Sequence, residues 1–163
     1  MAIRNYREIG ENLQKIVNRL MANDTLVKLL YYNDADPLKY ENLTEDEKRR
    51  EIFNKLIRII PKVTAKETTR SVIAIRITSG NTISSNKEFK VINIAIEVFV
   101  PWDQWIFKST NLRPFAILGE IQDSLDGKTI NGLGKIDGGD FALSYLTDEI
   151  ACYEQTFRIT QYD

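Results

Sequence analysis

One segment of this chain looks at first like part of a phosphate-binding loop. Gly127-Lys128-Thr129 matches the last three residues of that loop, whose lysine contacts nucleotide phosphates. The full pattern requires a glycine five positions earlier, and that position is Gln122. It also requires a strand before the loop and a helix after it, whereas here a helix is expected before and a strand after. We therefore predict a glycine that ends a helix, and no nucleotide site.

Three pairs of carboxylates could in principle serve acid–base catalysis or bind a metal ion. Catalytic carboxylates must converge in a pocket, and carboxylates in turns or at helix ends are usually solvated caps. A calcium loop needs ligands at set positions over twelve residues, and no such spacing is present. We predict caps rather than a metal site for all three pairs, which are Asp34 with Asp36, Asp123 with Asp126, and Asp137 with Asp140.

Nucleophilic catalysis has few candidate residues, because the chain has no histidine and one cysteine, Cys152. These counts exclude a Ser-His-Asp triad, a Cys-His dyad, a His-ligated zinc ion and an internal disulfide. Cys152 falls in an expected strand, where a thiol is usually a small hydrophobic side chain. The sequence thus favours a binding or structural protein over an enzyme, with no cofactor.

Composition and charge narrow the class further. Of 163 residues, 43% are hydrophobic and 28% are charged, which is typical of one globular domain. A net charge of -1 excludes a strongly basic nucleic-acid binder. Residues 1–70 carry 14 basic and 11 acidic side chains, whereas residues 71–163 carry 8 basic and 12 acidic. This asymmetry is either ordinary surface scatter or the polarity of a molecule that stacks head to tail.

The first part of the chain, residues 1–62, is expected to be helical. Apolar residues at spacings of three and four predict an amphipathic helix over 6–21. Asn23-Asp24 then offers an N-cap for a short helix over 25–31. Thr44 and Glu47 fit a capping box at the start of a third helix. The isoleucine-rich run that Pro61 ends could be helix or strand.

The second part, residues 70–163, is expected to form a sheet with one helix. Alternating apolar residues predict a hairpin whose strands cover 72–78 and 89–100. A helix is expected to begin at Arg113-Pro114 and to end near Asp126-Gly127. Further on we predict a short strand over 129–135, a turn over 136–140, and strands over 141–146 and 150–162. The expected fold is a single α+β domain, with N-terminal helices followed by an antiparallel β-sheet that packs a helix on one face.

Two loops are candidate binding segments. Trp102, Trp105 and Phe107 follow Pro101, and they could fold over the core as a flap or anchor an interface. The polar loop over 79–87, with Gly80, Asn81 and Asn86, could be an arm that becomes ordered against a partner.

The longest apolar-rich run falls far short of the roughly 20 residues that span a bilayer. The N-terminus has no apolar segment typical of a signal peptide. We therefore expect a soluble protein, made in the cytosol, with no membrane partner.

The second part of the chain also carries a family resemblance. A hairpin ends in Ile94-Ala95-Ile96-Glu97-Val98-Phe99-Val100-Pro101, and a helix begins at Leu112-Arg113-Pro114-Phe115. The phrase Tyr145-Leu146-Thr147-Asp148-Glu149-Ile150 then leads into an aromatic strand. Over roughly residues 70–163, this order resembles the tail terminator (tail completion) family and related neck proteins at the head–tail junction of tailed bacteriophages.

The resemblance implies a structural virion protein without catalysis, located in the tail or neck. Such a protein forms a homo-hexameric ring that caps the tail tube protein and docks the tail to the head–tail connector proteins. In contractile tails it also touches the tail sheath, and DNA passes through its lumen without specific binding. The alternatives are a head-completion (stopper) neck protein and a small cytosolic ligand-binding α+β domain.

Overall fold

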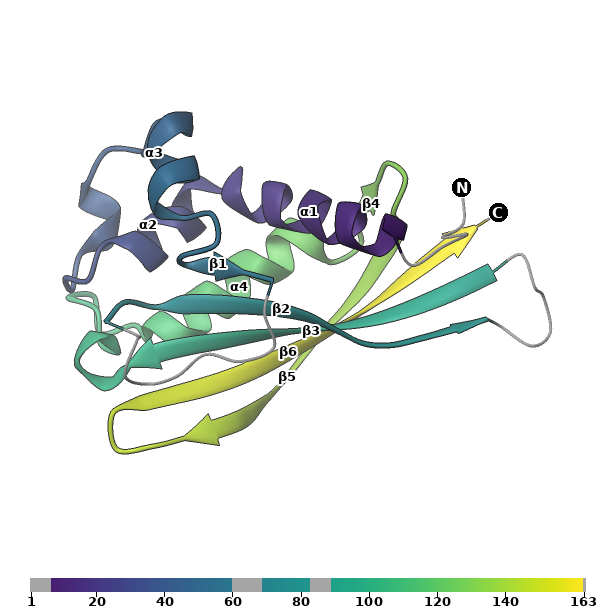
Figure 1. Ribbon diagram of the computed structural model, residues 1–163. Helices are drawn as coiled ribbons and strands as arrows, with labels where there is room; N and C mark the ends of the chain where they lie inside the picture. The colour runs from purple at the N-terminus through teal and green to yellow at the C-terminus, as the bar shows by residue number, and fades with distance from the viewer. Residues whose placement is uncertain (1–6, 60–68, 83–88, 163) are drawn as a thin grey trace.

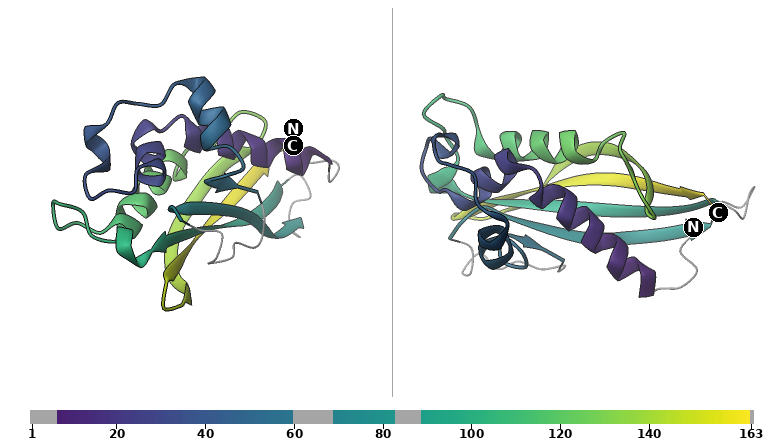
Figure 2. Two further views of the ribbon diagram at one scale, coloured as in Figure 1. Left: turned by 60° about the vertical axis from the view of Figure 1, so that its left-hand side comes forward. Right: turned by 90° about the horizontal axis from the view of Figure 1, so that it is seen from above.

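The computed structural model describes residues 7–59, 69–82 and 89–162, in which a layer of helices lies on one face of a six-stranded sheet (Figure 1). Seen from above, the helices lie across strongly twisted strands (Figure 2). The α+β class predicted from the sequence is confirmed. None of the helices in the described ranges is long and apolar enough to cross a membrane.

The first two helices form where the apolar spacing predicts them. Helix α1 covers Arg7–Met21, and its stripe of Ile16, Val17 and Leu20 is fully buried. Helix α2 covers Asp24–Tyr31. Asn23 caps α2, because its side-chain oxygen accepts a hydrogen bond from the amide of Leu26 at 3.0 Å. That bond satisfies one of the free amides of the first turn.

Helix α3, Glu45–Glu51, begins at the predicted capping box. The Thr44 hydroxyl accepts from the Glu47 amide at 3.3 Å, and the Glu47 carboxylate accepts from the Thr44 amide at 2.8 Å. The helix ends early, and Asn54 adopts a left-handed conformation with φ 58°. The isoleucine-rich run is therefore not a continuation of the helix, because Ile57–Arg58 form the short strand β1.

The sheet has the order β1-β2-β3-β6-β5-β4. Strand β1 runs parallel to β2, and every other neighbouring pair is antiparallel. The prediction of an antiparallel sheet is thus correct except at this one edge. The remaining strands are β2 (Val72–Thr82), β3 (Phe89–Pro101), β4 (Thr129–Ile130), β5 (Gly134–Leu146) and β6 (Ile150–Tyr162).

Two predicted loop segments are strands. Ser79 to Thr82 continue β2 past a bulge and pair with Asn93 to Lys90 of β3, so the loop expected to begin at Ser79 was wrong there. The turn predicted over 136–140 lies within β5, which bulges between Gly138 and Asp140. Gly138 has φ 140°, and a Cβ atom there would lie 2.6 Å from the Thr156 carbonyl oxygen. Glycine therefore marks a β-bulge at this position rather than a turn.

Helix α4, Arg113–Leu125, packs on β3 and β5 and carries proline in its first turn as predicted. Gly127 follows it with φ 67°, as expected of a glycine that ends a helix. A short 3-10 helix, η3 (Trp102–Gln104), lies before α4, and another, η1 (Pro37–Lys39), follows α2. The core fills the space between helices and sheet, where Ile94, Ile96, Ile117, Ile121 and Ile159 are fully or almost fully buried.

Candidate interaction surface

The largest fully buried side chain is a cation, Arg113. Its guanidinium donates to the carbonyl oxygens of Leu29 (2.5 Å) and Tyr32 (2.9 Å) at the C-terminal end of α2. It also donates to those of Asp34 (2.6 Å) and Gln104 (2.8 Å). The four bonds join α2, the turn after it and η3 to the start of α4. Carbonyls at the end of a helix favour a cation, which suits this placement.

Burial lowers the pKa of Arg113 to about 10, and the nearby Asp34 opposes the shift, so the side chain remains charged at neutral pH. Its guanidinium carbon lies 4.9 Å from the ring centre of Phe107. Phe107, a predicted interface residue, is half-buried and packs on this cation and the core. Its ring therefore packs directly against the Arg113 guanidinium.

The β5–β6 hairpin extends beyond α4 at one end of the sheet (Figure 1). Aromatic side chains from this hairpin, α4 and the segment around η3 contact one another. We call this group the aromatic surface; it consists of Trp102, Trp105, Phe115, Phe141 and Tyr153, together with the neighbouring Leu143. Ring contacts run through it from η3 across α4 to β5 and β6. Phe141 and Leu143 are 54% and 53% exposed. Exposed apolar groups in contact with one another commonly mark a protein interface.

The two tryptophans predicted as candidates stack on each other, with ring centres 4.7 Å apart. The Trp102 indole donates to the Thr147 carbonyl at 2.8 Å and remains 40% exposed. The Trp105 indole donates to the Val100 carbonyl at 3.2 Å, and its ring packs on the core. Trp105 thus packs inward, as expected of a flap over the core, whereas Trp102 faces outward, and its role as an interface anchor stays a prediction.

Sequence reasoning missed the other half of the aromatic surface. Phe141 and Leu143 belong to an alternating strand, a pattern that predicts an inward face and not an exposed one. Phe115 follows Pro114 on a helix that was expected to pack on the sheet. One sequence signal could have found these residues. The alternating strand extends further than the predicted helix over 113–125 can cover, so apolar residues at its end must be exposed.

In the second candidate segment, the described residues of the polar loop do not belong to the aromatic surface. Gly80 and Asn81 lie in β2, where they pair with Ile92 and Val91. Asn86 lies outside the described residues. Gly80 is exposed and has an ordinary backbone conformation.

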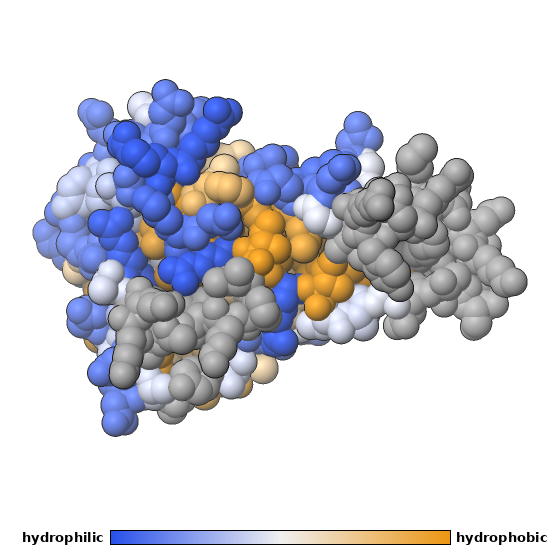
Figure 3. All heavy atoms as spheres, in the orientation of Figure 1, coloured by the Kyte–Doolittle hydropathy of each residue, from blue (hydrophilic) through white to orange (hydrophobic). Residues whose placement is uncertain are grey.

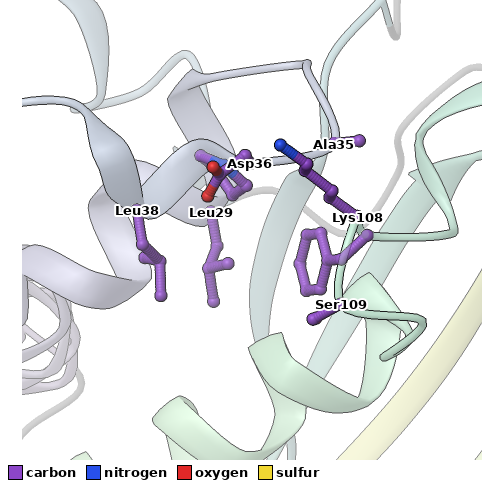
Figure 4. Close-up of a pocket in the computed structure, with 8 residues that line it drawn as sticks. Leu29, Ala35, Asp36, Leu38, Lys108 and Ser109 are labelled. Atoms are coloured by element: carbon purple, nitrogen blue, oxygen red, sulfur yellow. The ribbon is translucent and has the colours of Figure 1, made fainter.

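A separate cavity of about 420 Å³ lies between the end of α2 and the loop before α4 (Figure 4). Leu29, Leu38 and Phe107 supply apolar walls, and Asp36 and Lys108 supply charged groups. The Lys108 amide donates to the Ala35 carbonyl at 2.7 Å, which ties the two rims together. A mostly apolar hollow with a few polar groups has the general character of a small-ligand site.

The face of the sheet away from the helices carries a small charged cluster. Arg76 of β2 pairs with Glu97 of β3 at 3.3 Å and with Glu154 of β6. Burial raises the pKa of Glu97, and the charge of Glu154 adds to this rise, whereas Arg76 opposes it. The cluster therefore holds one carboxylate in surroundings that disfavour its charge.

Several of the groups considered for chemistry in the sequence take structural roles. Asp34 accepts hydrogen bonds from the Tyr40 hydroxyl and the Asp36 amide, which lower its pKa, so it acts as a turn cap. Asp137 pairs with Lys135 at 3.0 Å. Burial raises the pKa of Cys152 to about 12, so its thiol stays protonated. Among the described residues, no three acidic or cysteine side chains are grouped to hold a metal ion.

Comparison with known proteins assigns the chain to a family. A model of the YomW family matches residues 23–159. The chain belongs to the YomW family. This family is associated with bacteriophages, which supports the phage origin predicted from the resemblance. The YomW match begins at the cap of α2, and therefore includes α2 and α3 as well as the sheet and α4. No curated protein matches the sequence significantly.

Proposed function

We propose that the protein is a structural component of a tailed-phage virion, namely a tail terminator that caps the tail tube and joins the tail to the head connector. The observation that carries the proposal is the aromatic surface, which continues onto an exposed strand. Membership of a phage-associated family supports it. A protein that assembles through protein contacts needs such anchors at the centre of its interface.

In this role the protein works as a homo-hexameric ring without catalysis. The ring contacts the tail tube protein on one side and the head–tail connector proteins on the other, and in a contractile tail it also contacts the sheath. The surplus of carboxylates in residues 71–163 suits a lumen through which DNA passes without binding, because like charges repel.

The test replaces exposed apolar residues of the aromatic surface. In a phage that lacks the gene, the double variant Phe141→Ser, Leu143→Ser should fold normally but fail to restore infectious particles. Loss of a cap leaves tube growth unchecked, so unjoined tails of irregular length should accumulate beside filled heads. Electron microscopy of lysates and plaque counts provide the readout.

Leu38→Ser is the matched control, because Leu38 is 51% exposed and lies at the cavity, away from the aromatic surface. Normal particles from the double variant would overturn the proposal. Tails of normal length beside empty heads would favour the head-completion role instead. Loss of function in Leu38→Ser alone would favour the third possibility, a ligand-binding domain that uses the cavity.

A further inference from the structure

In the part of the chain that the structure describes, both edges of the sheet are unpaired over stretches of equal length. Strand β1 pairs with β2 only at Ile73 and Ala74, so within the described residues Ile75–Thr82 have no strand on their outer side. Strand β4 pairs with the first two residues of β5, and Lys128 and Asp126 bond Ile136 and Gly138. The described strands leave the outer side of β5 unpaired over Gly139–Leu146.

The open stretch of β5 has an exposed charge at Asp140 and a bulge between Leu143 and Tyr145, but the residues between them are little protected. Edge strands normally carry lysine, proline or inward charges that discourage pairing with another chain. Here Phe141, Ala142, Leu143 and Ser144 follow one another, and all four are exposed. Residues 141–144 therefore offer backbone groups that no described strand pairs, flanked by apolar side chains on the helix side and small side chains on the other. The carbonyls of Gly139 and Asp140, in contrast, already accept hydrogen bonds from the side chains of Gln155 and Thr156.

The opposite edge has the matching surface. Figure 3 shows apolar atoms between α1 and the neighbouring strands, on the face viewed in Figure 1. Leu13 of α1, Ile59 after β1 and Ile77 of β2 are half-buried hydrophobic residues packed against the core. A strand added outside β2 would place side chains like those of Phe141 and Leu143 beside this apolar strip.

Strand direction agrees with pairing between the two edges. Each step from β2 to β3, β6 and β5 is antiparallel, so β5 runs opposite to β2. A second copy placed beside the first would thus continue the sheet as an antiparallel pair. When the two unpaired stretches are aligned, the β5–β6 turn of the second copy points toward β1 of the first copy.

The charges favour pairing of β5 with β2 of another copy over pairing of β5 with β5. The β5 edge and its turn expose Asp140, Asp148 and Glu149, whereas β1 and the start of β2 are flanked by Arg58, Arg70 and Lys55, the last paired with Glu51. Two β5 edges face to face would bring the acidic groups together. Pairing of β5 with β2 instead brings the acidic β5–β6 turn of one copy toward the basic residues beside β1 of the next copy.

We infer that the protein self-assembles head to tail, with the β5 edge of one copy (Gly139–Leu146) adding as a strand to the β2 edge of the next (Ile75–Thr82). A contact between two different patches closes into a ring when the rotation per copy allows it. The inference rests on the proposed function for the ring, and names the neighbouring copy as the partner of the exposed part of the aromatic surface.

Site-directed cross-linking tests this arrangement. Ser79 and Ala142 are exposed, and both lie on the face away from the helices, since Ser79 bonds Asn93 and Ala142 lies opposite Glu154. The variants S79C, A142C and S79C/A142C are treated with a short bismaleimide, as concentrated protein and within phage particles. Wild type is the background control, because its cysteine is only 1% exposed.

The double variant should give a ladder of covalent oligomers, and a mixture of the two single variants should give dimers. A142C alone, and S109C/A142C with a cysteine on a distant loop, should remain monomeric. Dimers from A142C alone would mean that β5 edges pair with each other and would overturn the inference. So would the absence of a ladder in infectious particles that contain the double variant, a result that leaves the proposed function standing.

Discussion

At the scale of single residues, the molecule depends on a buried charge that is bonded to the backbone of distant segments. Arg113 is fully buried and is bonded to four backbone carbonyls from three segments. From the sequence, Arg113 is recognised only as a residue at the start of a helix, because nothing in the sequence distinguishes a buried arginine from an exposed one. Three of its four partners lie 79 to 84 residues earlier, and no periodicity links them to Arg113.

Arg113→Lys should lower the free energy of unfolding by about 3 kcal/mol, because an ammonium cannot reproduce the planar set of donors and leaves buried carbonyls unpaired. Urea denaturation measures the effect. Arg50→Lys is the control, since Arg50 is exposed and pairs with Glu51 at the surface, so its change should be under about 0.5 kcal/mol. If both variants lowered the free energy of unfolding equally, the buried hydrogen bonds of Arg113 would contribute no more to stability than a surface ion pair.

Glu97 gives the protein a pH dependence with a definite sign. Burial raises its pKa in the folded state, so folding favours the protonated carboxyl. This contribution is fully present below the unfolded pKa of about 4.3 and is lost as pH rises through the folded pKa. Glu97→Gln should therefore gain stability relative to wild type between about pH 4 and pH 7. Urea denaturation at several pH values would contradict this if the difference stayed constant or fell.

At the scale of elements, periodic spacing of apolar residues predicted the helices correctly, whereas glycine-rich and very short segments were not predicted correctly. The helices α1, α2 and α4 follow from the spacing of their apolar residues and from the caps at Asn23 and Gly127. The predicted turn over 136–140 was wrong because glycines signal bulges as readily as turns. The sequence could not decide between helix and strand for β1, because its two residues form a strand only through pairing with β2, which includes the pair of Ile57 with Ile73.

The bulge in β5 can be tested through its glycine. Gly138→Ala should destabilise the protein by at least about 2 kcal/mol, since alanine disfavours φ 140° and its Cβ would meet the Thr156 carbonyl at 2.6 Å. Gly80→Ala is the matched control in the other edge strand, where the nearest atom lies 3.9 Å away, and it should stay within about 0.5 kcal/mol. Thermal unfolding of both variants would refute the account if Gly138→Ala were neutral.

At the scale of the whole molecule, the near-neutral net charge conceals local groups of opposite sign at the two edges of the sheet. Lys55, Arg58 and Arg70 lie beside β1 and the start of β2, and Asp148 and Glu149 lie in the β5–β6 turn. The candidate surface was predictable only in part. Trp102 and Trp105 were found because tryptophans in a loop are unusual, whereas Phe115, Phe141 and Leu143 look like core residues until the reach of α4 is known.

Electron microscopy of purified tail tubes mixed with the protein tests the central claim most directly. A tail terminator should add a single six-fold ring to one end of each tube, and the Phe141→Ser, Leu143→Ser variant should leave that end bare while Leu38→Ser caps it. Bare tube ends after incubation with wild-type protein, or density along the tube instead of at its end, would contradict the assignment.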